Sequence, residues 1–160
     1  RLPICVYRDP KGNSIQITSI KHLMKSRLFK QGNFTQEMCK YISEDKKNGL
    51  KNFKIFFIMD TDDCDGQMLK KYKNKTMFNN HWLKPYIVPI YNSPNLDQVL
   101  IDLGYDIDAK RKTASYQKVF PGISGDMKTF EKLLDLFEKC PNRRSNMKRL
   151  LKYLYSFLDK

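Results

Sequence analysis

Several features that mark common functional classes are missing from this sequence. The 160 residues include four cysteines but no Cys-x-x-Cys pair, so a zinc site is not expected. Only two histidines occur, His22 and His81, and their surroundings favour structural roles over metal binding. No apolar run reaches the roughly 18 residues of a membrane span, and the first residues do not form a signal peptide. These absences predict a cytoplasmic protein with reduced thiols and no membrane partner.

Acidic residues are outnumbered, because 17 Asp and Glu face 30 Lys and Arg and leave a net charge of +13. An excess of this size favours binding to a polyanion, and nucleic acid, DNA or RNA, is the partner we expect. The alternative is a Lys-rich surface that serves only solubility. Because no Lys/Arg run is long enough to form a basic tail, the charge is expected on the folded surface.

Apolar periodicity predicts strands and helices in alternation. Continuous apolar runs predict strands, and apolar residues at helical spacing predict amphipathic helices. The predicted strands cover about residues 2–8, 53–59 and 86–90, and the predicted helices cover about residues 15–28, 34–42, 67–73, 96–103, 130–137 and 147–158. This order predicts an α/β fold with a mainly parallel central sheet flanked by helices, followed by C-terminal helices.

The segment Lys54–Gln67, KIFFIMDTDDCDGQ, joins the clearest predicted strand to a cluster of aspartates. In open α/β sheets ligands bind beyond the carboxyl ends of the strands, where Asp60 and Asp62 are expected. Two carboxylates this close repel each other unless a cation lies between them, and oxygen ligands suit Mg²⁺ or Mn²⁺. Asp63 is a further candidate metal ligand, and Asp65 is expected to cap the following helix. An Asp-rich surface turn is the alternative to a metal site.

Three segments, in order, resemble the Toprim (topoisomerase–primase) fold, in particular its RloB-like group. FFIMDTDDCD resembles the Asp-x-Asp element of the family, PIYNSPNLDQVLIDLGY its following strand and helix, and SYQKVFP a later Tyr-x-Lys element. The resemblance covers about residues 2–121. It implies a Toprim-like α/β core over residues 1–122 and a C-terminal helical part over residues 123–160 that packs on the same domain.

The resemblance also implies roles for individual side chains. Asp60 and Asp62 would hold a Mg²⁺ or Mn²⁺ ion and act in catalysis, and Asp97 would add a further metal-binding carboxylate. The alternative for Asp97 is an acidic residue that answers the dipole of a helix N-terminus. Lys118 would contact phosphate or stabilise developing charge, unless it is only a solvated lysine.

The C-terminal helix region is basic on one side and rich in leucine on the other. The basic side is a candidate clamp for the nucleic-acid backbone, together with Lys118, and the alternative is a solvated face. The leucine side is expected to pack in the core or against a homo-oligomer or partner protein. The candidate nucleic-acid-binding residues of this region are Arg143, Arg144, Lys148 and Arg149.

The chain departs from the family pattern at one position. Toprim nucleases carry a Glu followed by Gly at the end of their first strand, and that Glu acts as a general acid or base beside the metal. No Glu-Gly pair occurs in this sequence, and the glutamates present look solvent-facing in helical patterns. If residues 2–8 form the second strand of the family, the first strand and its Glu precede Arg1, on an upstream segment or a separate fragment. Otherwise the protein is a relative that does not cleave.

The function implied by the resemblance is a Mg²⁺-dependent nuclease that cleaves phosphodiester bonds of DNA or RNA in bacterial defence against phage. One alternative is a non-catalytic nucleic-acid-binding module with a degenerate Toprim site. Another is a phosphatase of the haloacid-dehalogenase type, with Asp60 as the nucleophile and Asp62 as the acid/base.

Overall fold

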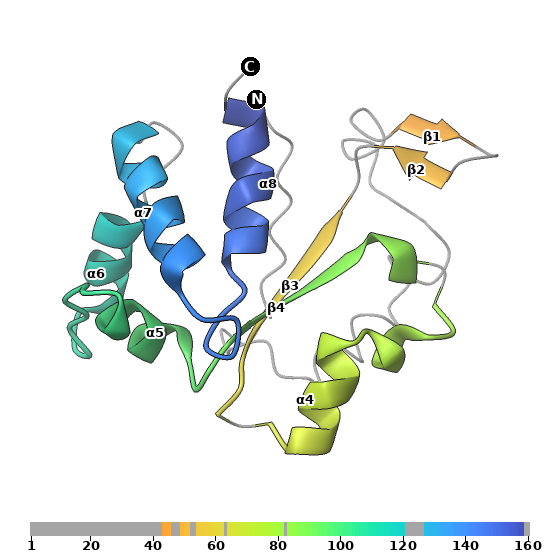
Figure 1. Ribbon diagram of the computed structural model, residues 1–160, viewed down its shortest axis with the longest axis horizontal. Coiled ribbons are helices and arrows are strands. Elements are labelled where there is room, and N and C mark those ends of the chain that lie inside the picture. Colours follow the sequence, from red (N-terminus) through yellow and green to blue (C-terminus); the bar gives the residue numbers. More distant parts are fainter. Residues whose placement is uncertain are drawn as a thin grey trace. The chain divides into compact units, whose positions relative to one another are not determined.

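The structure of the chain is a computed structural model that describes residues 43–45, 49–51, 54–62, 64–81, 83–120 and 127–158. These residues form a mixed α/β fold with a small two-stranded parallel sheet and five α-helices (Figure 1). The elements are β1 (Ser43–Asp45), β2 (Gly49–Lys51), β3 (Ile55–Asp60), α4 (Gly66–Lys73), the 3-10 helices η1 (Thr76–Phe78) and η2 (Lys84–Tyr86), β4 (Ile87–Asn92), α5 (Leu96–Asp102), α6 (Lys112–Val119), α7 (Met127–Lys139) and α8 (Lys148–Leu158).

Most of the predicted elements within the described residues are confirmed. The strands predicted near 53–59 and 86–90 are β3 and β4, and they pair in parallel. The helices predicted at 67–73, 96–103, 130–137 and 147–158 are α4, α5, α7 and α8. The strand predicted at 2–8 and the helix predicted at 15–28 lie outside the described residues, as does the predicted helix at 34–42. No helix of the described residues is long and apolar enough to cross a membrane.

The chain divides into two compact units. Unit 1 comprises Arg1–Met59 and Cys64–Pro89, and unit 2 comprises Asp60–Asp63 and Ile90–Lys160. Both β3 and β4 begin in unit 1 and end in unit 2. The residues that follow the two strands, including the aspartates of interest, therefore belong to unit 2. The domain boundary expected at residue 122 stays a prediction.

Aromatic side chains contribute to the core of the described part of unit 1, together with Met59, Leu83 and Ile87. Tyr72 of α4 is fully buried, and its hydroxyl donates a hydrogen bond of 2.7 Å to the backbone oxygen of Phe57. The Phe57 and Phe78 rings stack with their centroids 5.8 Å apart. The continuous apolar run of β3 suggests a strand that is buried on both faces. Ile58, however, is 40% exposed, so one face of β3 is partly open to solvent. Because side chains alternate along a strand, only the Phe57 and Met59 face is buried.

Local capping signals set the ends of two helices. The Asp65 carboxylate accepts a hydrogen bond of 2.9 Å from the Met68 backbone nitrogen, so the predicted N-cap of α4 is confirmed. The predicted stop after α5 is also confirmed. Gly104 follows this helix with a φ of 91°, a left-handed conformation that glycine adopts without strain.

Strands β1 and β2 and helix α6 were not predicted from the sequence. Strands β1 and β2 pair in an antiparallel register that sets Ser43 opposite Lys51, where the sequence predicts only the end of a helix. Helix α6 lies in a polar, basic stretch that carries no clear helical periodicity, and only Ser115 and Val119 of this helix are buried. The four-residue spacing of these two residues marks the single face that α6 buries.

In unit 2, the connection between α7 and α8 runs along the end of β4. Ser145 forms an antiparallel bridge with Asn92, and the Ser93 backbone nitrogen donates a hydrogen bond of 2.7 Å to the Arg144 oxygen. The Asn146 side-chain oxygen accepts a hydrogen bond of 2.9 Å from the Tyr91 backbone nitrogen. Residues 144–146 therefore hold the last residues of β4 from the side, and they fix where the loop after this strand begins.

Asn92 is the polar centre of this arrangement because it is completely buried. Its side-chain oxygen accepts a hydrogen bond of 2.8 Å from the Ser145 hydroxyl, whose oxygen in turn accepts one of 3.1 Å from the Met147 backbone nitrogen. Its side-chain nitrogen donates a longer hydrogen bond, 3.4 Å, to Asp60. Buried polar groups linked in this way stabilise a structure only while each of them keeps its partner.

Helices α7 and α8 are the last elements of unit 2. Leu133 and Phe137 of α7 and Leu151 of α8 are buried in the core, as the apolar spacing of these helices predicts. The rings of Phe130 and Tyr155 stack with centroids 6.1 Å apart. The leucine face of α8 thus contributes to the core of the chain itself.

We expect Asn92→Ala to lower the free energy of unfolding by about 2 kcal/mol, because it removes the acceptor of the buried Ser145 hydroxyl. Urea denaturation measures this loss. The matched control is Asn80→Ala, since Asn80 is exposed, and a change below about 0.5 kcal/mol is expected there. Equal losses in the two variants would contradict a structural role for the Asn92 amide.

Candidate functional site

Asp60 is the last residue of β3 and its carboxylate is half-buried. One carboxylate oxygen, Oδ1, accepts a hydrogen bond of 3.0 Å from the Leu96 backbone nitrogen and one of 3.4 Å from the Asn92 side chain. Burial raises the pKa of Asp60, and these two hydrogen bonds only partly offset that rise. The nearby negative charges of Asp62 and Asp97 raise the pKa further. The Asp60 carboxyl group is therefore more costly to ionise than an exposed aspartate.

The Asp60–Asp62 loop is tied to the loop after β4 by its backbone. The Thr61 nitrogen donates hydrogen bonds to the Asn92 and Pro94 oxygens, at 3.0 and 2.7 Å, and the Asp62 nitrogen donates one of 3.0 Å to Pro94. The Asn95 side chain has two functions. Its side-chain oxygen caps α5 by accepting a hydrogen bond of 2.9 Å from the Gln98 backbone nitrogen. Its side-chain nitrogen donates a hydrogen bond of 3.1 Å to the Asp62 carboxylate. The same asparagine thus begins a helix and orients an exposed carboxylate.

Asp97 lies in the first turn of α5 and is held by two side chains of α6. The Tyr116 hydroxyl donates a hydrogen bond of 2.5 Å to Oδ1, and the Lys112 ammonium lies 2.5 Å from Oδ2. Burial raises the pKa of Asp97, but the hydrogen bonds and positive charge from α6 outweigh it, so the pKa lies below its ordinary value. Lys112 and Tyr116 are four residues apart and share one face of α6, which explains how both reach one carboxylate.

The three aspartates, Lys112 and Tyr116 form one electrostatic group, called here the carboxylate cluster. The hydrogen bond and negative charge of Asp97 raise the pKa of Lys112, and Asp60 raises it further. Burial, and then Asp97, raise the pKa of Tyr116, so its phenol stays protonated and remains a donor. With the three carboxylates ionised and one ammonium present, the cluster carries a net charge of −2. A cation beside Asp60 and Asp62 would lower the cost of this crowding.

The carboxylate oxygens of the cluster differ in whether they accept a hydrogen bond or ion pair from the protein. Both oxygens of Asp97 have a donor. Asp60 and Asp62 each use one oxygen, and within the described residues their second oxygens accept no hydrogen bond. Mg²⁺ binds through one or two carboxylates and keeps several waters, so Asp60 and Asp62 fit such an ion. Asp97, as it stands, would have to release Lys112 or Tyr116 to become a ligand.

Among the described residues, the wider set of predicted metal ligands is not assembled. The part of the chain that the structure describes contains no group of three or more His, Cys, Asp or Glu side chains that could hold a metal ion. Asp63 lies outside the described residues. A site of the kind predicted would thus rest on Asp60 and Asp62, with water or substrate completing the shell.

The predicted nucleic-acid-binding residues lie elsewhere in unit 2. Lys118 is exposed on α6, two residues beyond Tyr116, so it does not share the helix face that carries Tyr116 and Lys112. Arg144 forms an ion pair with Asp102 at the end of α5. The other three residues are at the start of α8 or just before it: Arg143 and Arg149 are exposed, and Lys148 is half-buried.

Sequence reasoning missed three side chains that shape the cluster, namely Lys112, Asn92 and Asn95. The signal for Asn95 was its place just before α5, where an N-cap is common. The signal for Lys112 was its spacing of four residues before Tyr116, which becomes visible only once α6 is known to be a helix. Asn92 is identified by burial, which its sequence neighbours do not indicate.

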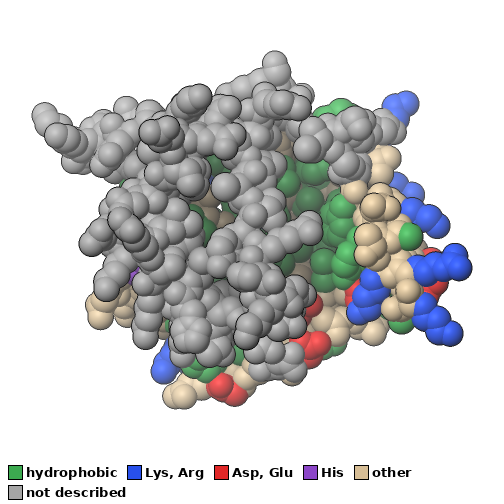
Figure 2. All heavy atoms as spheres, turned by 180° about the vertical axis from the view of Figure 1, so that it is seen from behind, with side chains coloured by type: hydrophobic (Ala, Val, Ile, Leu, Met, Phe, Trp, Pro, Cys, Tyr) green, Lys and Arg blue, Asp and Glu red, His purple; other side chains and the backbone are tan. Residues whose placement is uncertain are grey.

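Basic residues surround the cluster on the side formed by α6. Exposed cations follow one another at the start of this helix, and no acidic residue lies between residues 109 and 120. Figure 2 shows Lys and Arg side chains gathered on the side of unit 2 that carries α6 and α7. The basic residues of α6 and the segment before it are Lys110, Arg111, Lys112 and Lys118. A phosphate chain that approaches the carboxylates would meet these cations.

We expect Lys112→Met to raise the pKa of Asp97, because it removes a hydrogen bond and the opposite charge while burial remains. Tyr116→Phe is expected to raise the same pKa by a smaller amount. Carboxyl carbon chemical shifts followed by NMR against pH measure both effects. Lys118→Met is the matched control on the same helix, and it should leave the pKa of Asp97 unchanged. Equal shifts from the Lys112 and Lys118 variants would contradict the geometry of the cluster.

Comparison of the chain with protein-family models, with curated proteins and with solved structures gives no match in any of the three. The chemistry of the site therefore follows from its own residues: a pair of carboxylates suited to a divalent cation, beside an ammonium group that a third carboxylate holds in place.

Proposed function

We propose that this protein is a metal-dependent nuclease with a Toprim-like core, in which Asp60 and Asp62 hold a Mg²⁺ or Mn²⁺ ion against a phosphodiester. The observation that carries the proposal is the carboxylate cluster, which gathers after two parallel strands in a chain of net charge +13. Acidic residues that bind a cation and a basic surface that binds phosphate are both needed for such chemistry. The more extensive parallel sheet of a Toprim fold is part of this proposal.

The side chains of the cluster have separable roles in this mechanism. A bound divalent ion would supply Lewis-acid stabilisation of charge on the phosphate. Lys112, more than half exposed, would bind a non-bridging phosphate oxygen, and Asp97 and Tyr116 keep its ammonium beside Asp60 until substrate arrives. Asn92 and Leu96 hold Asp60 on one oxygen, which would leave the other oxygen available to a bound ion. Groups fixed in this way need little rearrangement when substrate binds.

A proton-transfer residue is not identified among the described side chains. The two glutamates whose side chains are described have partners on α8: Glu131 accepts a hydrogen bond of 3.0 Å from Tyr155, and Glu138 lies 2.6 Å from Lys152. This observation favours a second candidate function, a nucleic-acid-binding module that keeps the carboxylates without cleaving. The nuclease proposal requires a base from another part of the protein, as the Glu-Gly element of the Toprim family would supply.

The wider setting follows from the same proposal. The substrate class is DNA or RNA, because the exposed cations beside the cluster suit a chain of phosphates better than a single small ester. A role in bacterial defence against phage, in the cytoplasm, is the setting that the RloB-like resemblance implies. Assembly with a second copy or with a partner protein is compatible with this role.

We expect the wild-type protein to cleave single-stranded or duplex DNA or RNA in Mg²⁺ or Mn²⁺, and Asp60→Ala or Asp62→Ala to lower the rate by at least about 100-fold. Loss of a carboxylate removes half of the proposed cation site. Gel analysis of labelled substrates measures the rate. Asp135→Ala, at an exposed aspartate of α7, is the matched control and should cleave like the wild type.

Three other outcomes would contradict the nuclease proposal. Cleavage that survives Asp60→Ala would place the chemistry elsewhere. Binding of nucleic acid by both proteins, with no cleavage by either, would leave the binding module. Hydrolysis of a small phosphomonoester through an aspartyl-phosphate would instead support the phosphatase of the haloacid-dehalogenase type.

A further inference from the structure

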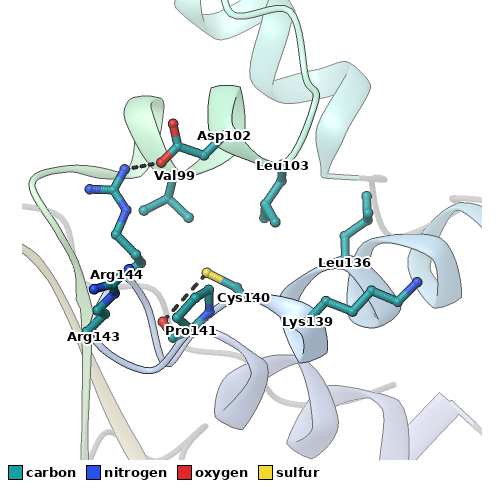
Figure 3. Close-up of a pocket in the computed structure, with 9 residues that line it drawn as sticks. All are labelled: Val99, Asp102, Leu103, Leu136, Lys139, Cys140, Pro141, Arg143 and Arg144. Atoms are coloured by element: carbon teal, nitrogen blue, oxygen red, sulfur yellow. Dashed lines mark hydrogen bonds and ion pairs between the residues drawn. The ribbon is translucent and has the colours of Figure 1, made fainter.

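A pocket of about 440 Å³ lies in unit 2, between α5, α7 and the segment that follows α7 (Figure 3). Pockets that bind small molecules are commonly of this size or somewhat larger. The proposed function does not use this pocket. Its walls come from Val99, Asp102 and Leu103 of α5 and its C-terminus, from Leu136 and Lys139 of α7, and from Cys140, Pro141, Arg143 and Arg144.

The floor of the pocket is apolar. Val99 and Cys140 are almost completely buried, and Leu103 and Leu136 are partly exposed. The Cys140 thiol lies 3.9 Å from the Pro141 backbone oxygen and so faces its own chain segment. An apolar group in the pocket would remove the exposed parts of Leu103 and Leu136 from water at little cost in lost hydrogen bonds.

The rim of the pocket is positively charged. Arg144 forms an ion pair with Asp102, which also accepts a hydrogen bond of 2.9 Å from Gln98. Figure 3 shows Arg144 and Lys139 at opposite ends of the pocket. Neither Lys139 nor Arg143 forms a side-chain hydrogen bond or ion pair within the described residues. Three cations against one carboxylate leave a net charge of +2 around an apolar floor, and this combination favours a ligand that joins an anionic group to an apolar one.

The pocket is connected to the carboxylate cluster through α5 and through the end of β4. Asp97, in the first turn of α5, belongs to the cluster, and Asp102, in its last turn, belongs to the pocket. They are five positions apart on the helix, about 8 Å along its axis. The backbone oxygen of Arg144 accepts the hydrogen bond from Ser93, in the loop that also holds Asp62. A separation of this scale suits neighbouring nucleotides of an extended strand.

We infer that this pocket binds one nucleotide of a single-stranded nucleic acid, with the base on the apolar floor and the two phosphates that flank the nucleotide at opposite ends, one on Arg143 and one on Lys139 (Figure 3). The inference rests on the proposed function, since it names where the substrate is held beside the cluster. A base is accessible to such a pocket only when it is unpaired, so the ligand is a single strand rather than a duplex. The Arg143 guanidinium can also stack on the face of a base.

Fluorescence anisotropy with labelled single-stranded DNA and RNA in EDTA tests this inference without cleavage. We expect Arg143→Glu and Lys139→Glu to weaken binding about tenfold more than Lys132→Glu, a control with the same charge change on the exposed face of α7. Leu103→Trp fills the pocket without changing charge, and we expect it to weaken single-strand binding about tenfold and leave duplex binding unchanged. Equal binding by the pocket variants and their controls would overturn the inference.

Methyl NMR of the wild-type protein covers the case in which a variant does not fold. Addition of the single strand should shift the methyl signals of Val99, Leu103 and Leu136. Ile101 is the matched control, because it lies on α5, is 47% exposed and does not line the pocket. Unmoved pocket methyls at saturating single strand would overturn the inference.

The pocket inference and the nuclease proposal can be rejected independently of each other. Cleavage by the wild type, with pocket variants that bind as tightly as their controls, would reject the pocket and keep the nuclease. Weaker binding by the pocket variants, with no cleavage of any nucleic acid in Mg²⁺ or Mn²⁺, would keep the pocket and reject the nuclease.

Discussion

The cost of keeping a partly buried carboxylate charged beside two others at the end of β3 is the constraint on which the site depends. One short segment, residues 92–97, supplies the hydrogen bonds to Asp60 and Asp62 that lower this cost. Asn92 and the Leu96 nitrogen donate to Asp60, and Asn95 donates to Asp62. The same segment supplies Asp97, whose charge is balanced by Lys112 instead. Donors and cations stabilise the charge of a carboxylate in a crowded site, and here each of the three accepts hydrogen bonds from a different set of groups.

The position of that segment depends in turn on contacts far away in the sequence. Asn92 links Asp60, 32 residues before it, to Ser145, 53 residues after it. Through Ser145 and Asn92, the connection between α7 and α8 thereby helps to hold Asp60 in position. The proposed nucleotide pocket uses that connection as well, since it lies beside Arg143 and Arg144. One segment thus supports both the carboxylates and the proposed binding site for substrate.

The sequence predicted the parts of this arrangement that local patterns encode. The apolar run ending at Asp60 predicted β3, and side-chain capping and helical spacing predicted α4, α5, α7 and α8. It did not predict α6, because a polar helix that buries little more than Ser115 and Val119 has almost no apolar stripe. Without α6, Lys112 could not be assigned to the cluster, and a lysine two residues from Tyr116 was favoured instead. Burial of Asn92 depends on tertiary contacts, so no local pattern reveals it.

The central claim is that Asp60 and Asp62 together bind a divalent cation through the oxygens that the protein leaves unused. Isothermal titration calorimetry with Mn²⁺ and Mg²⁺ measures this directly, in the absence of nucleic acid. The account predicts one site of millimolar or tighter affinity that is lost in Asp60→Asn and in Asp62→Asn and is kept in Asp135→Asn. No heat of binding at millimolar metal, or equal binding by all four proteins, would contradict it.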